Sequence, residues 1–188
     1  MPIDREGTAA AVRALLDAIG EDPRRAGLVE TPRRVAEAFE ELFVGYDVDP
    51  VALLEPLPGE RASSTILVKD VSLVSFCEHH LLPFVGMAAV AYLPGADGRI
   101  CGLSKLSRLI EALSRRLQVQ ERLVAEAADA LESALAPRGV FVMVEAEHFC
   151  MSLRGARKPG ARMVTIETRG VFDDPAERSA LFRALGMG

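Results

Sequence analysis

The chain has 188 residues, 49% hydrophobic and 26% charged, which is enough apolar material for a sizeable core and argues against disorder. Its formal net charge of −5 disfavours nucleic acid or an anionic membrane as partner, because either needs a concentrated positive surface. No apolar run approaches the roughly 20 residues that span a bilayer, and the first residues lack a secretory-signal pattern. We therefore expect a cytoplasmic protein with no membrane partner.

The N-terminal part of the chain predicts helices. Apolar residues at helical spacing predict a first helix over residues 9–20. A second helix is predicted over residues 32–44, because Thr31 resembles a cap and Pro32 suits the first helical position. Residues 47–64 are rich in proline and lack periodicity, so we predict a connector there.

The remainder predicts strands and helices in alternating pairs. β-Branched runs indicate two paired strands over residues 65–76 and 85–93. Two helices follow, the first capped by Ser104 and the second ending before Pro137. Two further strands are predicted over residues 140–146 and 163–172, and a terminal helix over residues 175–185. The predicted order is helices, two strands, two helices, two strands and a helix.

Cysteine and histidine are clustered. The chain has three of each, and five of these six residues fall within residues 77–80 and 148–150. Three cysteines are too few, and odd in number, for a disulfide framework. Cys77 and His80 have a C-x-x-H spacing that can direct both side chains at one ion, and Cys150 can add a third ligand. Such a set leaves the fourth zinc position for water, and thiolates favour zinc over magnesium or calcium.

Other interpretations of these residues remain open. Cys77 and Cys150 could be buried apolar thiols beside a hydrogen-bonded core histidine, although the clustering favours a metal site. Cys101 has no neighbouring histidine and is predicted to be an ordinary buried thiol. His79 and His148 are candidates for proton transfer, or else support and packing residues. If the strand from residue 140 continued, His148 and Cys150 would share one face.

Longer motifs surround these residues. The segment SFCEHHLLPF, residues 75–84, resembles the zinc signature of the GTP cyclohydrolase I family. Five more segments resemble other motifs of that family, in the family's order: ETPRRV (30–35), GLSKL (102–106), RLQVQERL (116–123), HFCM (148–151) and RG (154–155). The resemblance covers nearly the whole chain.

The resemblance implies an α+β tunnelling fold, with an antiparallel sheet and paired helices in each subunit. Subunits of this family join into a β-barrel ring, and two rings stack as a homodecamer with active sites between subunits. Residues 61–188 would form the tunnelling-fold catalytic domain. Residues 1–60 would form a helical N-terminal region and connector.

The resemblance also implies roles for individual residues. The zinc ligands would be Cys77, His80 and Cys150, and the acid/base histidines would be His79 and His148. The substrate-binding residues would be Glu121 for guanine, supported by Gln120, then Ser104, Lys105, Arg108 and Arg154 around ribose and triphosphate, and Arg34 from a neighbouring subunit.

The implied reaction converts GTP and water to 7,8-dihydroneopterin triphosphate and formate, with Zn2+ as cofactor. The residue types suit this chemistry, because attack on guanine carbon 8 needs a hydroxide at neutral pH and a proton donor at nitrogen 7. A carboxylate can accept from guanine N1–H and the exocyclic amine, and cations can meet the triphosphate. Without the surrounding motifs, the preferred interpretation would be different. Glu121 would pair with Arg122 or Arg116 on a helix surface, and Lys105, Arg108 and Arg154 would be solvent-exposed charged side chains.

Three alternatives remain. A sibling enzyme could stop at a ring-opened formamidopyrimidine or act on another purine nucleotide, although the presence of both His79 and His148 argues against it. A non-catalytic nucleotide-binding regulator could keep a structural zinc. A nitrile reductase of the same architecture would need a reactive cysteine free of metal, and only Cys101 would remain.

Overall fold

A computed structural model of the chain describes residues 3–58 and 64–187. The chain divides into two compact units, Met1–Asp47 and Val48–Gly188. None of the helices within the described residues combines the length and the apolar character that a bilayer crossing needs.

The N-terminal unit is a pair of helices, α1 (Arg5–Ala18) and α2 (Thr31–Leu42), followed by a 3-10 turn, η1 (Val44–Asp47). Both predicted helices are confirmed. The predicted cap of the second helix is wrong, because Glu30 is the capping residue and Thr31 already lies in the helix. The helix can start this early because Pro32 lacks an N–H that would need a partner in the first turn.

The predicted connector contains a short helix, α3 (Pro50–Leu53), which its lack of periodicity did not indicate. The Asp49 carboxylate accepts from the backbone N–H groups of Val51 and Ala52, and a proline opens the helix. Leu54, the next residue, is fully buried in the core. Part of the connector, residues 59–63, lies outside the described residues.

The second unit is built on one five-stranded sheet of order β3-β1-β2-β4-β5. Its strands are β1 (Ile66–Cys77), β2 (Pro83–Leu93), β3 (Leu117–Gln118), β4 (Gly139–His148) and β5 (Arg162–Gly170). All neighbours are antiparallel except β1 and β3, so the sheet is mixed and the chain is α+β. The four predicted strands are confirmed, although the last ends at Gly170 and continues as a 3-10 turn, η2 (Val171–Asp173).

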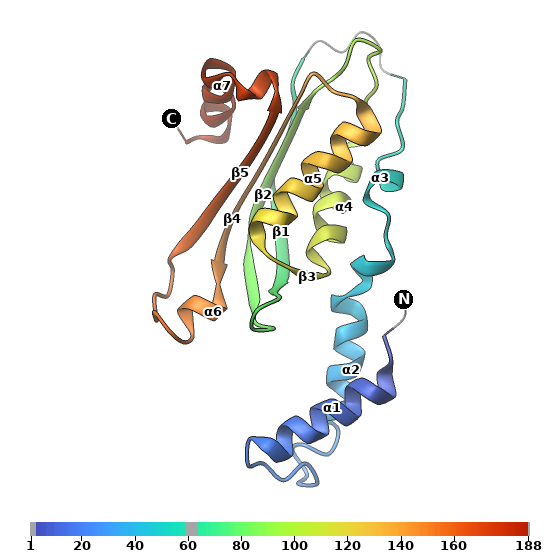
Figure 1. Ribbon diagram of the computed structural model, residues 1–188, viewed down its shortest axis with the longest axis vertical. Helices are drawn as coiled ribbons and strands as arrows, with labels where there is room; N and C mark the ends of the chain where they lie inside the picture. The colour runs from blue at the N-terminus through green and yellow to red at the C-terminus, as the bar shows by residue number, and fades with distance from the viewer. Residues whose placement is uncertain (1–2, 59–63, 188) are drawn as a thin grey trace. The chain divides into compact units, whose positions relative to one another are not determined.

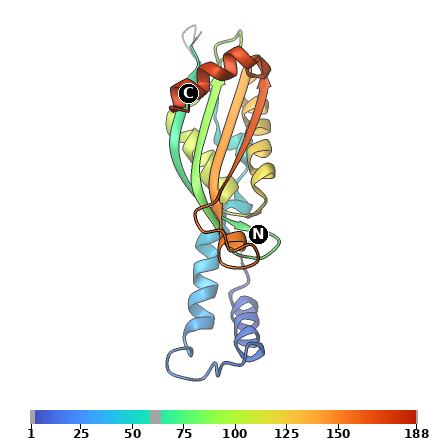
Figure 2. The same ribbon diagram turned by 90° about the vertical axis from the view of Figure 1, so that its left-hand side faces the viewer.

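Helices cover the sheet unequally. Figures 1 and 2 show α4 (Leu103–Ser114) and α5 (Gln120–Leu135) side by side across one face, where their leucines and valines pack on the main core. The terminal helix α7 (Pro175–Leu185) packs on the opposite face, in a smaller core with Phe141 and Phe172. Ser104 was predicted to cap α4, but Gly102 is the capping residue, because the helix begins at Leu103, two residues earlier than a Ser104 cap implies.

Strand pairing brings segments that are distant in the sequence to one end of the sheet. The turn after β1 leads into β2, and Phe84 of β2 lies opposite His148 at the end of β4. The short strand β3 pairs with the end of β1, and the Glu78 N–H donates to the Gln118 carbonyl at 3.0 Å. Because α5 starts two residues after Gln118, its first turn is held beside the turn after β1.

Candidate metal centre and active site

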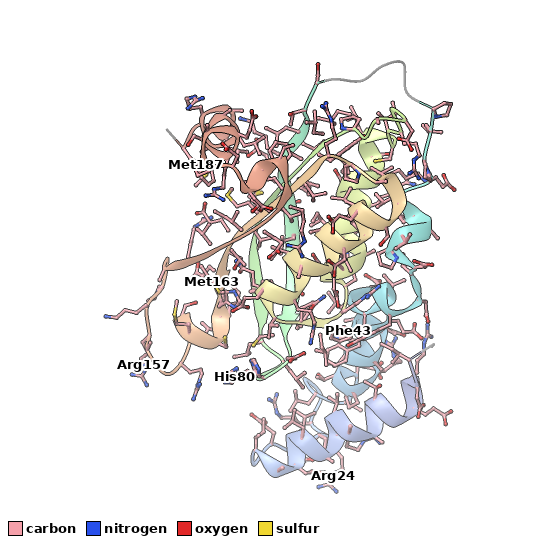
Figure 3. All side chains as sticks on the ribbon, turned by 45° about the horizontal axis from the view of Figure 1, so that its top comes forward. Arg24, Phe43, His80, Arg157, Met163 and Met187 are labelled. Atoms are coloured by element: carbon pink, nitrogen blue, oxygen red, sulfur yellow. The ribbon has the colours of Figure 1, made fainter. Side chains whose placement is uncertain are left out.

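Cys77, His80 and Cys150 lie together. Their ligand atoms all fall within 4.8 Å of one another, and Cys77 Sγ lies 3.7 Å from His80 Nδ1. Cys77 is the buried last residue of β1, and the following turn closes through the Leu81 N–H, which donates to the Cys77 carbonyl at 2.9 Å. Figure 3 shows His80 at this turn. The prediction that the three residues meet is confirmed.

The donor set suits a soft divalent cation. Two sulfur atoms and one imidazole nitrogen occupy three corners of a small site, which leaves a tetrahedral ion one open position. Burial raises the pKa of the Cys150 thiol, and the adjacent Cys77 raises it further because two thiolates repel. A bound cation relieves both effects, so the local electrostatics favour metal over a pair of bare thiolates.

Cys150 reaches the cluster by a different route from the one predicted. A strand continuing from residue 140 through Cys150 is wrong, because β4 ends at His148 and the chain turns into a short helix, α6 (Phe149–Ser152). The Ser152 hydroxyl donates to the His148 carbonyl at 3.1 Å and secures this turn. His148 and Cys150 therefore face the site from a strand end and a helical turn.

His148 is half-buried and held on two sides. Its ring is stacked on Phe84, with centroids 4.6 Å apart and planes at 9°, and its Nε2 lies 2.8 Å from Gln120 Oε1. Burial lowers the pKa of the His148 imidazole, and the nearby Glu121 carboxylate opposes that shift. Sequence reasoning assigned no role to Phe84, because its position opposite His148 depends on the register of β2 and β4.

His79 lies on the outer side of the cluster. The residue is exposed, its Nδ1 is 3.8 Å from Cys77 Sγ, and its ring centroid is 6.2 Å from that of His80. It therefore stands close enough to the ligands to exchange protons with a molecule bound there or to orient a ligand.

Glu121 is exposed in the first turn of α5. The neighbouring Arg122 donates to Glu78 at 2.6 Å, to the Gln118 side chain at 2.8 Å and to the Leu117 carbonyl at 2.8 Å. Pairing between Glu121 and Arg122 was one interpretation of the sequence, but the guanidinium of Arg122 instead ties α5 to the turn that carries His80. Sequence reasoning missed this ion pair because its partners are 44 residues apart.

The cationic residues are only partly gathered at the cluster. Arg154 Nη1 lies 3.4 Å from His80 Nε2, so this arginine borders the metal ligands. Lys105, in the first turn of α4, forms an ion pair with Glu55 at 2.8 Å. Ser104 and Arg108 are exposed on the same helix. Within the described residues, no hydrogen bond or ion pair joins Lys105 or Arg108 to the metal cluster.

Arg34 belongs to the other unit, where it is exposed on α2. Its neighbour Arg33 forms ion pairs with Glu30 at 2.9 Å and with Glu37 at 2.6 Å. Of the two adjacent arginines, Arg33 is therefore the one whose side chain is ion-paired with residues of its own segment.

Structural comparison finds a weak likeness to a crystal structure described as the archaeosine synthase QueF-Like in the apo form. The TM-score is 0.46 at 16% sequence identity, and the match covers 57% of this chain and 94% of that chain. A likeness at this level assigns neither fold nor activity.

Sequence comparison is decisive. The family model described as GTP cyclohydrolase I matches residues 8–186. A GTP cyclohydrolase 1 of Thermobifida fusca (strain YX) is 56% identical over 186 residues, 99% of this chain and 90% of that protein. A GTP cyclohydrolase 1 of Mycobacterium leprae (strain Br4923) is 51% identical over 184 residues, 98% of this chain and 89% of that protein. The chain therefore belongs to the GTP cyclohydrolase I family.

Proposed function

We propose that this chain is a zinc-dependent GTP cyclohydrolase that converts GTP and water to 7,8-dihydroneopterin triphosphate and formate. The observation that carries the proposal is the three-donor cluster of Cys77, His80 and Cys150, with two further histidines beside it. Relatives 51–56% identical over almost the whole chain bear the name of this enzyme, which supports the same assignment.

Zinc fits the donor set. Cys77, His80 and Cys150 would hold the ion, and their Cys₂His composition leaves one tetrahedral position open, as in catalytic rather than structural zinc sites. When bound, zinc lowers the pKa of a coordinated water toward 7, which supplies the hydroxide that attack on guanine carbon 8 requires. The protein residues around it then have to bind the nucleotide and move protons.

His148 is the proposed proton donor to guanine nitrogen 7, and His79 is proposed to transfer a later proton or to orient His80. His148 is suited to the first role because Phe84 and Gln120 fix its ring beside the cluster. The exposed position of His79, 3.8 Å from Cys77 Sγ, suits the second role. Two histidines with different surroundings can serve different proton-transfer steps.

The nucleotide would lie across the first turns of α5 and α4. Glu121 is proposed to accept from guanine N1–H and the exocyclic amine. The resemblance groups Gln120 with Glu121, but the Gln120 side chain is fully buried and contacts His148, so we propose that it supports the site without contacting the nucleotide. The ribose and triphosphate would be bound by Ser104, Lys105, Arg108 and Arg154. Because Lys105 is already paired with Glu55, a bound triphosphate would have to compete with that carboxylate. Arg34 is proposed to enter the site of a neighbouring subunit.

The proposed assembly is the tunnelling-fold ring and, from two rings, a homodecamer, with residues 61–188 as the catalytic domain and residues 1–60 as helical region and connector. The sheet has edges that another copy could extend. Within the described residues, β5 ends the sheet on one side, and on the other side β1 pairs with β3 only at Phe76 and Cys77. Unpaired strand edges readily accept a further strand.

The proposed function is tested by incubating the zinc-loaded protein with GTP and measuring formate and pterin fluorescence separately. The proposal expects both products. Formate without pterin would indicate a sibling enzyme that stops at a ring-opened intermediate, and GTP binding without either product would indicate a regulator. The nitrile reductase alternative is disfavoured by Cys101, which is 5% exposed and whose thiol pKa is raised by burial.

Glu121→Gln is expected to weaken GTP binding strongly and to reduce discrimination against ATP, with fold and zinc content unchanged. A carboxylate can accept both guanine N–H groups, whereas an amide that accepts one must present a donor to the other. A binding site that no longer matches the hydrogen-bonding groups of its nucleotide discriminates far less well between that nucleotide and its analogues. A binding titration with GTP and ATP measures both effects, and unchanged GTP affinity would remove Glu121 from the guanine site.

A further inference from the structure

Gln120 is fully buried at the start of α5, and both polar atoms of its side chain are engaged. Its Oε1 lies 2.8 Å from His148 Nε2. Its Nε2 donates toward the Val144 carbonyl at 2.9 Å, the Met163 carbonyl at 3.1 Å and the Thr165 hydroxyl at 3.0 Å. The side chain therefore bridges α5, β4 and β5, and presents no exposed amide atom to a substrate. Figure 3 labels Met163, near the start of β5.

These partners fix the orientation of the amide. Val144 and Met163 offer carbonyl oxygens, which only accept hydrogen bonds, so the NH₂ group has to face them. The reverse orientation would place Oε1 against both carbonyl oxygens, where no hydrogen is available to either acceptor. Oε1 therefore faces His148.

The fixed amide in turn selects a form of the imidazole. An amide oxygen can only accept, so the 2.8 Å contact requires a hydrogen on His148 Nε2. The neutral ring then carries its hydrogen on Nε2 and its lone pair on Nδ1. The buried Phe84 stacks on the ring and fixes its plane, while Gln120 fixes its rotation within that plane.

We propose that Gln120 is a positioning residue that holds His148 as the Nε2–H tautomer, so that Nδ1 is the nitrogen that exchanges a proton with the substrate. The catalytic part rests on the proposed function, whereas the tautomer does not. When Nδ1 of the doubly protonated ring gives its proton to guanine nitrogen 7, the ring becomes the neutral Nε2–H form. That product is the form from which Gln120 accepts, so the ring needs no rotation after transfer.

The tautomer is measured on the zinc-loaded, otherwise unaltered protein labelled with ring ¹⁵N-histidine. The chain has three histidines, and the spectrum of His148→Ala identifies the pair of signals that belongs to His148. At a pH where the ring is neutral, we expect Nε2 to be protonated and Nδ1 to be bare. A protonated Nδ1 with a bare Nε2 would overturn the proposal. This measurement requires no turnover, so it stands even if the protein releases no formate from GTP.

Gln120→Leu tests the catalytic part. With zinc content retained, kcat is expected to fall by about 10- to 100-fold at unchanged KM, which is the usual effect of removing a residue that orients a catalytic group. The control is Thr165→Val, which removes one acceptor of the amide NH₂ but keeps the contact to His148. Its kcat should fall much less than that of Gln120→Leu. A raised KM at unchanged kcat would show that Gln120 contacts guanine and would overturn the proposal. If Gln120→Leu fails to fold, the tautomer measurement decides.

Discussion

His148→Ala is expected to release formate about 10²–10⁴-fold more slowly than the parent protein while keeping its zinc and its affinity for GTP. That loss is the usual contribution of a positioned general acid or base. The ring is held by Phe84 and Gln120 rather than by the metal cluster, so its removal leaves Cys77, His80 and Cys150 in place. Single-turnover measurement of formate, with zinc analysis and a GTP titration, separates the chemical step from binding.

His79→Ala is the matched comparison. Both substitutions remove an imidazole from the same site, but His79 is exposed, whereas His148 is packed against Phe84. The His79 variant is also expected to lose turnover, and accumulation of ring-opened formamidopyrimidine would assign it to a later step. Formate release at the parental rate in His148→Ala would contradict the assignment of His148 as the acid, and His79 would be the first candidate to replace it.

The long elements of the fold could be predicted because each repeats a pattern over many residues. The terminal helix α7 has the predicted bounds, and β1 and β2 pair as expected. The short elements α3, β3 and α6 have two to four residues, too few for a period to appear. They form because of capping interactions or contacts with other parts of the chain. The Asp49 side chain caps α3, and β3 pairs with the end of β1.

The metal cluster could be predicted because its residue types are rare in this chain and lie close together in the sequence. Its surroundings could not. Phe84 meets His148, and the Gln120 amide reaches Val144 and Thr165, only because the registers of β2, β4 and β5 align them. Phe84 and Gln120 lie in segments that resemble motifs of the family, but a motif does not show which side chain each residue contacts, and Thr165 is an ordinary strand residue.

The cationic residues illustrate a second limit of prediction from sequence. Sequence motifs indicate which side chains could meet a triphosphate, but they do not show what else those side chains touch. Lys105 is paired with Glu55, 50 residues away, and Arg154 lies beside His80, 74 residues away. Such partners depend on the packing of separate elements, so the strength of any phosphate contact depends on which ion pairs must first be broken.

Cys150→Ala is expected to abolish stable zinc binding, which should stand at about one ion per chain in the parent protein. Cys77 and His80 lie on one turn, whereas Cys150 comes from α6, so its removal leaves a two-donor pair with no ligand from the second segment. Because the cluster found within the described residues has only three protein donors, Cys77→Ala and His80→Ala should have the same effect. Zinc is measured by elemental analysis after dialysis, together with formate release, which should be lost in all three variants.

Cys101→Ala is the matched control for this experiment. Cys101 is as buried as Cys77, but its N–H donates to the Tyr92 hydroxyl at 3.1 Å, and it lies outside the metal cluster. Its removal deletes a buried sulfur atom of the core without touching a ligand, so stability should fall modestly while the zinc content stays at the parental level. Zinc loss in Cys101→Ala, or full zinc retention in Cys150→Ala, would contradict the ligand assignment. Either result would require a different donor set, because two residues on one turn do not hold zinc firmly by themselves.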